Sequence, residues 1–307
     1  MHLPLSNPPI GRFAPSPTGP LHFGSLVAAL GSCLTVRTRD GRWLLRMEDV
    51  DGPRCVPGAA DEILRQLETL GFAWDGDVAW QSRRSEAYAA ALERLQRSGH
   101  VFGCACTRRE VADSGLARDG SPRYPGTCRG GLPAGREARA WRFAAPAGDL
   151  HWADLLQGEQ VEDVAHDVGD FVLKRADGLF AYQLAVVVDD AEQGVTEVVR
   201  GADLLDSTAR QIALQRALGV VQPAYAHLPV ACNAAGEKLS KQTLARSVSD
   251  LRPAVALSAA LRFLGQPTPD ALARATVREV WEWALAHWDF ARVPRVRSVV
   301  VADLTTL

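Results

Sequence analysis

Two short segments near opposite ends of the chain carry residue types suited to phosphate chemistry. The first, Arg12–Leu26 (RFAPSPTGPLHFGSL), places a Pro/Gly-rich turn before a helical pattern. The free N–H groups of a helix N-terminus favour phosphate, and Gly24, without a Cβ, lets a purine approach the backbone. The second, Lys238–Gln242 (KLSKQ), holds two lysines that can neutralise a leaving pyrophosphate. Each segment alone also fits an ordinary turn or a solvated loop, whereas the pair predicts a nucleotide site.

A cluster of cysteines marks a second candidate site. Cys104, Cys106 and Cys128 lie in one segment, which in a cytosolic chain favours a metal over a disulfide. Tetrahedral zinc needs a fourth ligand, and both His100 and Tyr124 lie four residues before a cysteine. Imidazole is the commoner ligand, so chemistry alone favours His100. We expect one structural zinc ion, and the alternative is three free thiols.

Charged residues at the ends of predicted strands suggest an acidic amino acid as the substrate. Arg12 and Arg200 each offer a guanidinium fork that matches a carboxylate. Glu48 or Asp49, just after a predicted strand, can accept hydrogen bonds from an α-ammonium group. Tyr182 can donate one to the substrate. The alternative for each charged residue is a surface ion pair of little energetic weight.

Length and composition describe an ordinary globular chain. Its 307 residues suffice for about two domains, and 47% hydrophobic with 23% charged residues is typical of soluble proteins. The net charge of −2 argues against a protein that only coats nucleic acid, although a local basic patch remains possible. The N-terminal residues lack signal-peptide features, and the apolar run Leu184–Val188 is too short to span a bilayer. We expect a cytoplasmic monomer without membrane contact.

Alternating periodicities in the first hundred residues predict a parallel α/β sheet. A compact apolar run over Trp43–Met47, broken only by Arg46, predicts a buried strand. Apolar residues at helical spacing predict one helix from Leu21 and two more that end at Gly71 and Gly99.

Beyond an irregular stretch at 100–166 the alternation returns. We predict strands over Phe171–Leu173, Leu179–Val188 and Val195–Val199, with a turn at 176–178. A helix is expected from Thr208, with Gln211 completing a capping box, to Gly219. In the last 66 residues one strong helix opens at Thr276 and Glu279, with Trp281, Leu285 and Trp288 predicted to face the core.

These patterns predict a Rossmann-like parallel-sheet nucleotide-binding domain split by a zinc-containing insertion, followed by a small helical C-terminal region. The expected boundaries are 1–99 and 167–235 for the two halves of the catalytic domain, 100–166 for the insertion, and 236–307 for the lysine loop and helical region.

Both end segments resemble the two signatures of the class I aminoacyl-tRNA synthetases. His22–Ser25 (HFGS) is similar to the His-x-Gly-His motif, and 238–242 to the Lys-Met-Ser-Lys-Ser loop, with Ser25 and Gln242 as departures. The departure at Ser25 puts the role of that position in doubt. Three further stretches resemble the glutamyl branch of this family: 11–19 (GRFAPSPTG), 46–51 (RMEDVD) and 199–208 (VRGADLLDST).

This resemblance implies a set of site residues. A glutamate pocket would comprise Arg12, Phe13, Ala14, Pro15, Ser16, Glu48, Tyr182 and Arg200. ATP, with Mg²⁺, would contact Pro15, His22, Gly24, Ser25 and Lys241, and the catalytic residues would be His22, Lys238 and Lys241. A Cys-x-Cys…Tyr-x-x-x-Cys pattern implies zinc on Cys104, Cys106, Tyr124 and Cys128.

Glutamyl synthetases resembling this sequence continue into a large helical anticodon-binding region, whereas this chain stops. Its length and departures resemble the branch members that transfer L-glutamate to the modified base queuosine in the anticodon of tRNA(Asp). Two alternatives stay open. One is a conventional synthetase that charges the tRNA 3′ end. The other is a non-catalytic RNA-binding module, for which the locally basic insertion (Arg108, Arg109, Arg118, Arg123, Arg129) would serve.

Overall fold

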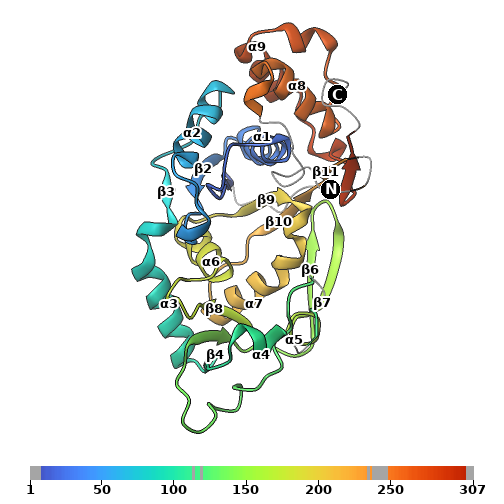
Figure 1. Cartoon of the computed structure of the whole chain (residues 1–307). Coiled ribbons are helices and arrows are strands. Elements are labelled where there is room, and N and C mark those ends of the chain that lie inside the picture. Colours follow the sequence, from blue (N-terminus) through green and yellow to red (C-terminus); the bar gives the residue numbers. More distant parts are fainter. Residues whose placement is uncertain (1–7, 113–114, 118–119, 234–235, 237–247, 302–307) are drawn as a thin grey trace.

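A computed structural model describes residues 8–112, 115–117, 120–233, 236 and 248–301 of the chain. It is an α/β protein built on parallel strands (Figure 1). One sheet contains, in order, β1 (Ile10–Phe13), β2 (Arg42–Met47) and β3 (Ala79–Trp80), all parallel. The predicted buried strand Trp43–Met47 is confirmed as β2.

A second sheet lies beside the β1 edge of the first sheet. Its order is β7-β6-β10-β9, and β9, β10 and β6 run parallel while β7 is antiparallel to β6. The Thr196 amide, just before β9, donates to the Ile10 carbonyl of β1 at 2.9 Å, which joins the two sheets. The strands are β6 (Asp149–Asp154), β7 (Gly158–Asp163), β9 (Glu197–Gly201) and β10 (Ala224–Leu228).

Helix α1 (Phe23–Arg37) lies between β10 and the C-terminal helix α8 (Pro253–Phe263), and it is buried along most of its length. A Cβ on Gly31 would come within 2.6 Å of Leu228 Cδ1, so only glycine allows this approach of helix to strand. On the other side Phe23 packs edge-on against Phe263, with ring centroids 5.7 Å apart. The predicted first helix is therefore confirmed.

Two amphipathic helices agree with the sequence pattern. Helix α2 (Ala59–Thr69) buries Ile63 and Leu67, and α3 (Ser85–Arg97) buries Tyr88, Leu92 and Leu95. Gly71 and Gly99, just beyond their ends, both have positive φ, as expected of residues that end a helix.

The segment predicted as a strand over Leu179–Val188 is instead α6 (Tyr182–Glu192), so that prediction was wrong. Residues 184–190 are all buried. A helix buried on every side shows no 3.6-residue period, and its three consecutive valines favour a strand by composition. Tertiary packing therefore decided the conformation here.

Helix α7 (Thr208–Leu218) ends at Gly219 as predicted, where the backbone is left-handed with φ 58°. The predicted capping box at its start is wrong, because Thr208 lies inside the helix. Its hydroxyl accepts from Arg200 Nη2 at 3.0 Å, and Gln211 donates to Gln183 at 3.0 Å. Both side chains therefore form hydrogen bonds with residues of other elements and do not cap this helix.

The C-terminal part holds one predicted helix and one that the sequence analysis missed. Helix α9 (Val277–His287) opens with the predicted Thr276/Glu279 capping box, and Trp281 donates to the Leu70 carbonyl at 2.8 Å. Leu285, predicted to be in the core, is 44% exposed. The missed helix is α8, and β11 (Val230–Cys232) pairs with β12 (Ser298–Val300) beside it.

The segment 100–166 contributes to two sheets. An antiparallel sheet joins β4 (Val101–Cys104), β5 (Ala140–Phe143) and β8 (Phe171–Lys174), next to α4 (Arg108–Ala112) and α5 (Val164–Asp167). Its β6–β7 hairpin joins the parallel strands through β10. None of the helices in the described ranges is both long and apolar enough to cross a membrane.

Candidate active site

A cavity of about 720 Å³ opens where β1, β2, β9 and β10 end and α1 begins. The carboxyl ends of parallel strands are where open α/β sheets bind ligands. Most residues that the sequence analysis assigned to glutamate or ATP line this one cavity: Arg12, Phe13, Ala14, Pro15, Ser16, His22, Gly24, Ser25, Glu48, Tyr182 and Arg200.

His22 caps the N-terminus of α1 at the edge of the cavity. Its Nδ1 accepts from the Ser25 amide at 3.3 Å, and its Nε2 lies 3.1 Å from the Ser25 hydroxyl. Ser25, which departs from the family signature, therefore holds the imidazole of the first signature histidine. The remaining N–H groups of this first turn lie where a phosphate would be favoured.

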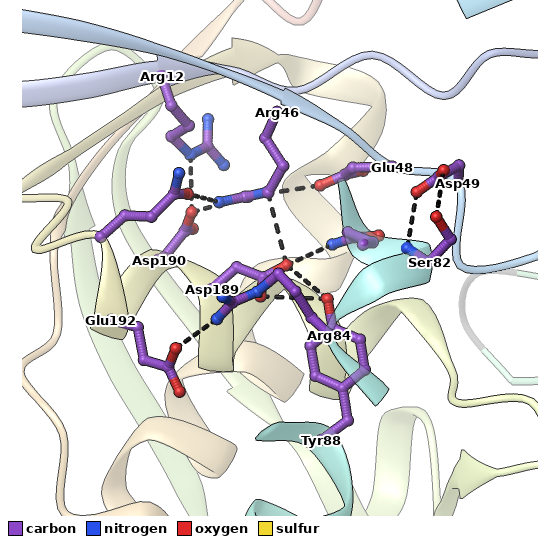
Figure 2. Close-up of polar contacts among 12 residues, drawn as sticks. Arg12, Arg46, Glu48, Asp49, Ser82, Arg84, Tyr88, Asp189, Asp190 and Glu192 are labelled. Atoms are coloured by element: carbon purple, nitrogen blue, oxygen red, sulfur yellow. Dashed lines mark hydrogen bonds and ion pairs between the residues drawn. The ribbon is translucent and has the colours of Figure 1, made fainter. Parts of the chain in front are cut away.

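Arg12 is held in the cavity wall by a buried ion-pair network (Figure 2). Its Nε donates to Asp190 Oδ1 at 3.1 Å, and the same oxygen accepts from Arg46 Nη2 at 2.8 Å. Arg46 is fully buried and reaches Glu48 at 3.4 Å and Gln193 at 2.6 Å. The two guanidinium groups outweigh the effect of burial, so the pKa of Asp190 is lowered.

A second carboxylate, Asp189, connects this network to residues in and next to α3. Its side chain has no exposed surface and accepts from Gln81 at 2.8 Å, from Arg84 at 2.6 Å and from the Tyr88 hydroxyl at 2.9 Å (Figure 2). Arg46 Nε lies 3.7 Å away. The adjacent acids of α6 thus connect β2 and α3 to the floor of the cavity.

Of the two acids after β2, Glu48 lines the cavity, whereas Asp49 binds the Ser82 amide and hydroxyl at 2.8 and 2.7 Å. Burial raises the pKa of Glu48 to about 7, although Arg46 and Arg12 act in the opposite direction. Of these two acids, Glu48 is therefore the one that faces the cavity.

Arg200 is fixed from three sides at the end of β9. Its Nε donates to His227 Nε2 at 3.0 Å, and its Nη2 donates to Thr208 Oγ1 at 3.0 Å and to the Leu204 carbonyl at 3.3 Å. Its Nη1 lies 3.5 Å from the Tyr182 hydroxyl. Arg200 and Tyr182, distant in sequence, therefore act on the same part of the cavity.

The cysteine cluster forms a compact donor set away from this cavity. The sulfur atoms of Cys104, Cys106 and Cys128 lie within 4.8 Å of one another, and those of Cys106 and Cys128 are 3.7 Å apart. The Tyr124 hydroxyl lies 3.6 Å from Cys104 Sγ and 3.9 Å from Cys106 Sγ. It also accepts the Cys128 amide at 2.7 Å.

These distances suit one tetrahedral ion. With Zn–S bonds of about 2.3 Å, the edges of a tetrahedron are roughly 3.8 Å, close to the separations found here. His100 instead bonds Ser98 at 2.8 Å and stacks on Phe143. Among the described residues, the metal-ligand group contains the three cysteines and leaves His100 outside. The three cysteines form a donor set compatible with zinc, and the Tyr124 hydroxyl is the further oxygen donor beside them.

The family description "tRNA synthetases class I (E and Q), catalytic domain" matches residues 10–268, a range that includes α1, strands β1 to β11 and every residue that lines the cavity. The chain belongs to this synthetase family. The predicted resemblance to the class I aminoacyl-tRNA synthetases is thereby confirmed.

Curated relatives match this chain over almost its whole length and over almost the whole of their own. The glutamyl-Q tRNA(Asp) synthetase of Dechloromonas aromatica (strain RCB) is 64% identical over 299 residues, covering 97% of this chain and 99% of the relative. The protein of the same name from Aromatoleum aromaticum is 65% identical over 288 residues, 94% and 91% of the two chains. The relative of the same name from Chromobacterium violaceum is 59% identical over 284 residues, which cover 92% of this chain and 95% of the relative.

Solved structures share the fold. The glutamate-tRNA synthetase of Elizabethkingia anophelis superimposes with a TM-score of 0.79 at 24% identity, covering 96% of this chain and 68% of the other. A glutamate tRNA ligase from Elizabethkingia meningosepticum, solved in complex with its amino acid, gives 0.78 at 24% identity, with 95% and 67% covered.

Three residues that hold Arg12 and Arg200 in the cavity wall escaped sequence reasoning: Arg46, Asp190 and His227. Arg46 was available as a signal, because a charge inside a buried apolar run needs a buried partner. Asp189 and Asp190, which close the apolar run of α6, were the matching signal. The predicted loop lysines Lys238 and Lys241 lie outside the described residues.

Proposed function

We propose that this protein activates glutamate with ATP and transfers it to the queuosine base in the anticodon of tRNA(Asp). The cavity carries the proposal, because it gathers Arg12, Arg200, Glu48 and Tyr182 beside a helix N-terminus. The high identity to relatives named glutamyl-Q tRNA(Asp) synthetase over nearly their full length supports the choice of substrate.

The amino acid would be read by complementary charge. Arg12 and Arg200 would bind carboxylate oxygens, and Glu48 would accept hydrogen bonds from the α-ammonium group. The Tyr182 hydroxyl, 3.5 Å from Arg200, would add a neutral donor. A buried Arg12 with a fixed partner loses little freedom on binding, which supports its use as the anchor.

In the first step a glutamate α-carboxylate oxygen attacks the α-phosphorus of ATP. The bond from phosphorus to the bridging oxygen breaks, pyrophosphate leaves, and glutamyl-adenylate forms. Such chemistry depends mainly on positioning and charge neutralisation. His22 and the first turn of α1 would hold phosphate oxygens, and Lys238 and Lys241 would stabilise the charge on the leaving group. Mg²⁺ bound with ATP supplies further charge neutralisation.

In the second step a hydroxyl of the queuosine ring attacks the activated carbonyl carbon. An ester bond forms, AMP leaves with the bonding electron pair, and the hydroxyl proton is released.

The segment 100–166, which interrupts a Rossmann-like domain, would bind zinc. Cys104, Cys106, Tyr124 and Cys128 would hold one structural zinc ion, which ties the end of β4 to the loop that follows α4. The Arg142 guanidinium lies 4.0 Å from the Tyr124 ring centroid and further fixes that ring. The ion would supply rigidity in a segment that is poor in apolar core.

A second cavity, of about 830 Å³, suggests where the anticodon arm docks. It lies between the insertion and α7, and its lining includes Arg108, Arg139, Arg142, Arg175 and Arg210 together with Asp170 and Asp177. This local positive excess suits phosphates despite the negative net charge of the chain. Charge reversal at Arg108 and Arg109 should therefore weaken tRNA binding. The same reversal at Arg278, on α9 at the opposite end of the molecule (Figure 1), is the matched control.

The decisive experiment is transfer of labelled glutamate to tRNA(Asp) isolated with and without queuosine. We expect label only on the queuosine-containing RNA and within an anticodon fragment after nuclease digestion. Label at the 3′ end would instead indicate a conventional glutamyl-tRNA synthetase. Absence of glutamate-dependent ATP–pyrophosphate exchange would favour a non-catalytic RNA-binding module.

A further inference from the structure

Three neighbouring strands each contribute one member of a buried hydrogen-bonded chain at or next to their last residue. Asp154 ends β6, His227 lies in β10, and Arg200 lies in β9 directly opposite His227 in the strand register. The side chains of Asp154 and His227 have no exposed surface. The carboxylate Oδ2 is 2.5 Å from His227 Nδ1, and His227 Nε2 is 3.0 Å from Arg200 Nε.

The direction of each hydrogen bond follows from the donors. Arginine has only donors, so His227 Nε2 must accept the Arg200 Nε–H. The imidazole is then neutral with its proton on Nδ1, where it donates to Asp154. The other oxygen of Asp154 accepts the amides of Leu156, Gln157 and His227 at 3.0, 2.8 and 3.2 Å. Asp154 is therefore fixed by backbone groups and selects one tautomer of His227.

We propose that Asp154 and His227 are positioning residues that orient the Arg200 guanidinium for a glutamate carboxylate. This inference rests on the proposed function of the cavity. His227 and Thr208 hold Nε and Nη2, so Nη1 is left to face Tyr182 in the cavity. A protonated imidazole, or the other tautomer, would present an N–H to the guanidinium N–H and turn it away.

The test uses a tautomer switch and its rescue. In Asp154→Asn the amide oxygen satisfies the three backbone N–H groups, so its NH₂ faces Nδ1 and forces the proton onto Nε2. In His227→Gln the side-chain oxygen can accept from Arg200 without help from residue 154. The double variant Asp154→Asn/His227→Gln should therefore recover most of the binding that Asp154→Asn loses.

Glutamate-dependent ATP–pyrophosphate exchange gives the kinetic result. We expect Asp154→Asn to raise KM for glutamate roughly tenfold or more, the scale for a hydrogen bond to a charged group. KM for ATP should stay within about twofold of the wild-type value. KM for glutamate in the double variant should approach that of His227→Gln alone. An unchanged KM for glutamate in Asp154→Asn, or losses that simply add in the double variant, would overturn the proposal.

A measurement that needs no activity separates this inference from the proposed function. Nitrogen NMR of the histidine side chains, with the signal assigned by its loss in His227→Gln, should show His227 protonated on Nδ1. In Asp154→Asn the proton should be on Nε2. Wild-type protein with the proton on Nε2, or on both nitrogens at neutral pH, would refute the positioning role. Failure of the proposed function would instead show as absent exchange in wild-type protein with the expected tautomer.

Discussion

Arg12 of β1 and Asp190 of α6 are joined by a 3.1 Å ion pair whose two side chains are only 4% and 8% exposed. Asp190 also accepts from Arg46 at 2.8 Å, so one carboxylate balances two buried cations. The arrangement fixes the Arg12 guanidinium at the cavity before any substrate arrives. Such preorganisation lowers the entropic cost of binding.

Asp190→Asn should lower both stability and glutamate affinity. Removing one partner of a buried ion pair typically costs about 3–5 kcal/mol, because the remaining charges stay buried. Glu192→Gln is a matched control. Glu192 lies on the same helix as Asp190 and binds Arg84, but its side chain is 53% exposed. Loss of this ion pair should therefore lower the free energy of unfolding by only about 0–1 kcal/mol. Urea unfolding measures both values. Equal, small losses in the two variants would contradict this role for Asp190.

Glutamate binding should weaken as the pH falls through about 7. Burial raises the pKa of Glu48 to about 7, so acid converts the carboxylate to a neutral acid that no longer holds an ammonium group. KM for glutamate should rise about tenfold from about pH 8 to about pH 6. Glu48→Gln should bind more weakly throughout and lose this dependence. If both proteins show the same pH profile, another group is responsible.

Removal of zinc should destabilise the insertion first. Chelation, or Cys106→Ser, should reduce a zinc content of about one ion per chain and increase hydrogen exchange between Cys104 and Cys128, since structural zinc contributes directly to folding. Cys55→Ser changes a partly exposed cysteine outside the cluster and serves as the control. Full zinc content in Cys106→Ser would show that the ion does not use this set of ligands.

Lys241→Ala should reduce adenylate formation by about 10²-fold or more, the scale for removing one transition-state contact. The chain has two other lysines, Lys238 and Lys174. Lys174 lies over the Phe180 ring at 5.1 Å and provides the control, because its replacement by alanine leaves the loop intact. Near-normal pyrophosphate exchange in Lys241→Ala would argue against the loop assignment.

Sequence reasoning located the elements whose periodicity comes from one buried face, such as α2, α3 and α9. It failed at two helices that are buried at most of their positions, α6 and α8. In α6 consecutive buried valines imitate a strand, and α8, with buried residues at most of its positions, escaped detection. The local pattern holds no information about neighbours that cover both faces, so only tertiary structure distinguishes these cases.

The same limit applies to the cavity. Arg12, Glu48 and Arg200 each follow or end a strand, so their place at the sheet edge was predictable. The supports of Arg200 were not, because His227 and Asp154 come from other elements whose register decides the contact. The choice between Tyr124 and His100 likewise needed the loop conformation, since both have the same spacing from a cysteine.

Arg46 lies within 3.7 Å of Glu48, Asp189 and Asp190, all buried. Replacing Arg46 by a neutral residue would leave these acids without their shared buried cation. We therefore expect neutral replacements of Arg46 to be tolerated best when one of its acidic neighbours is neutralised as well.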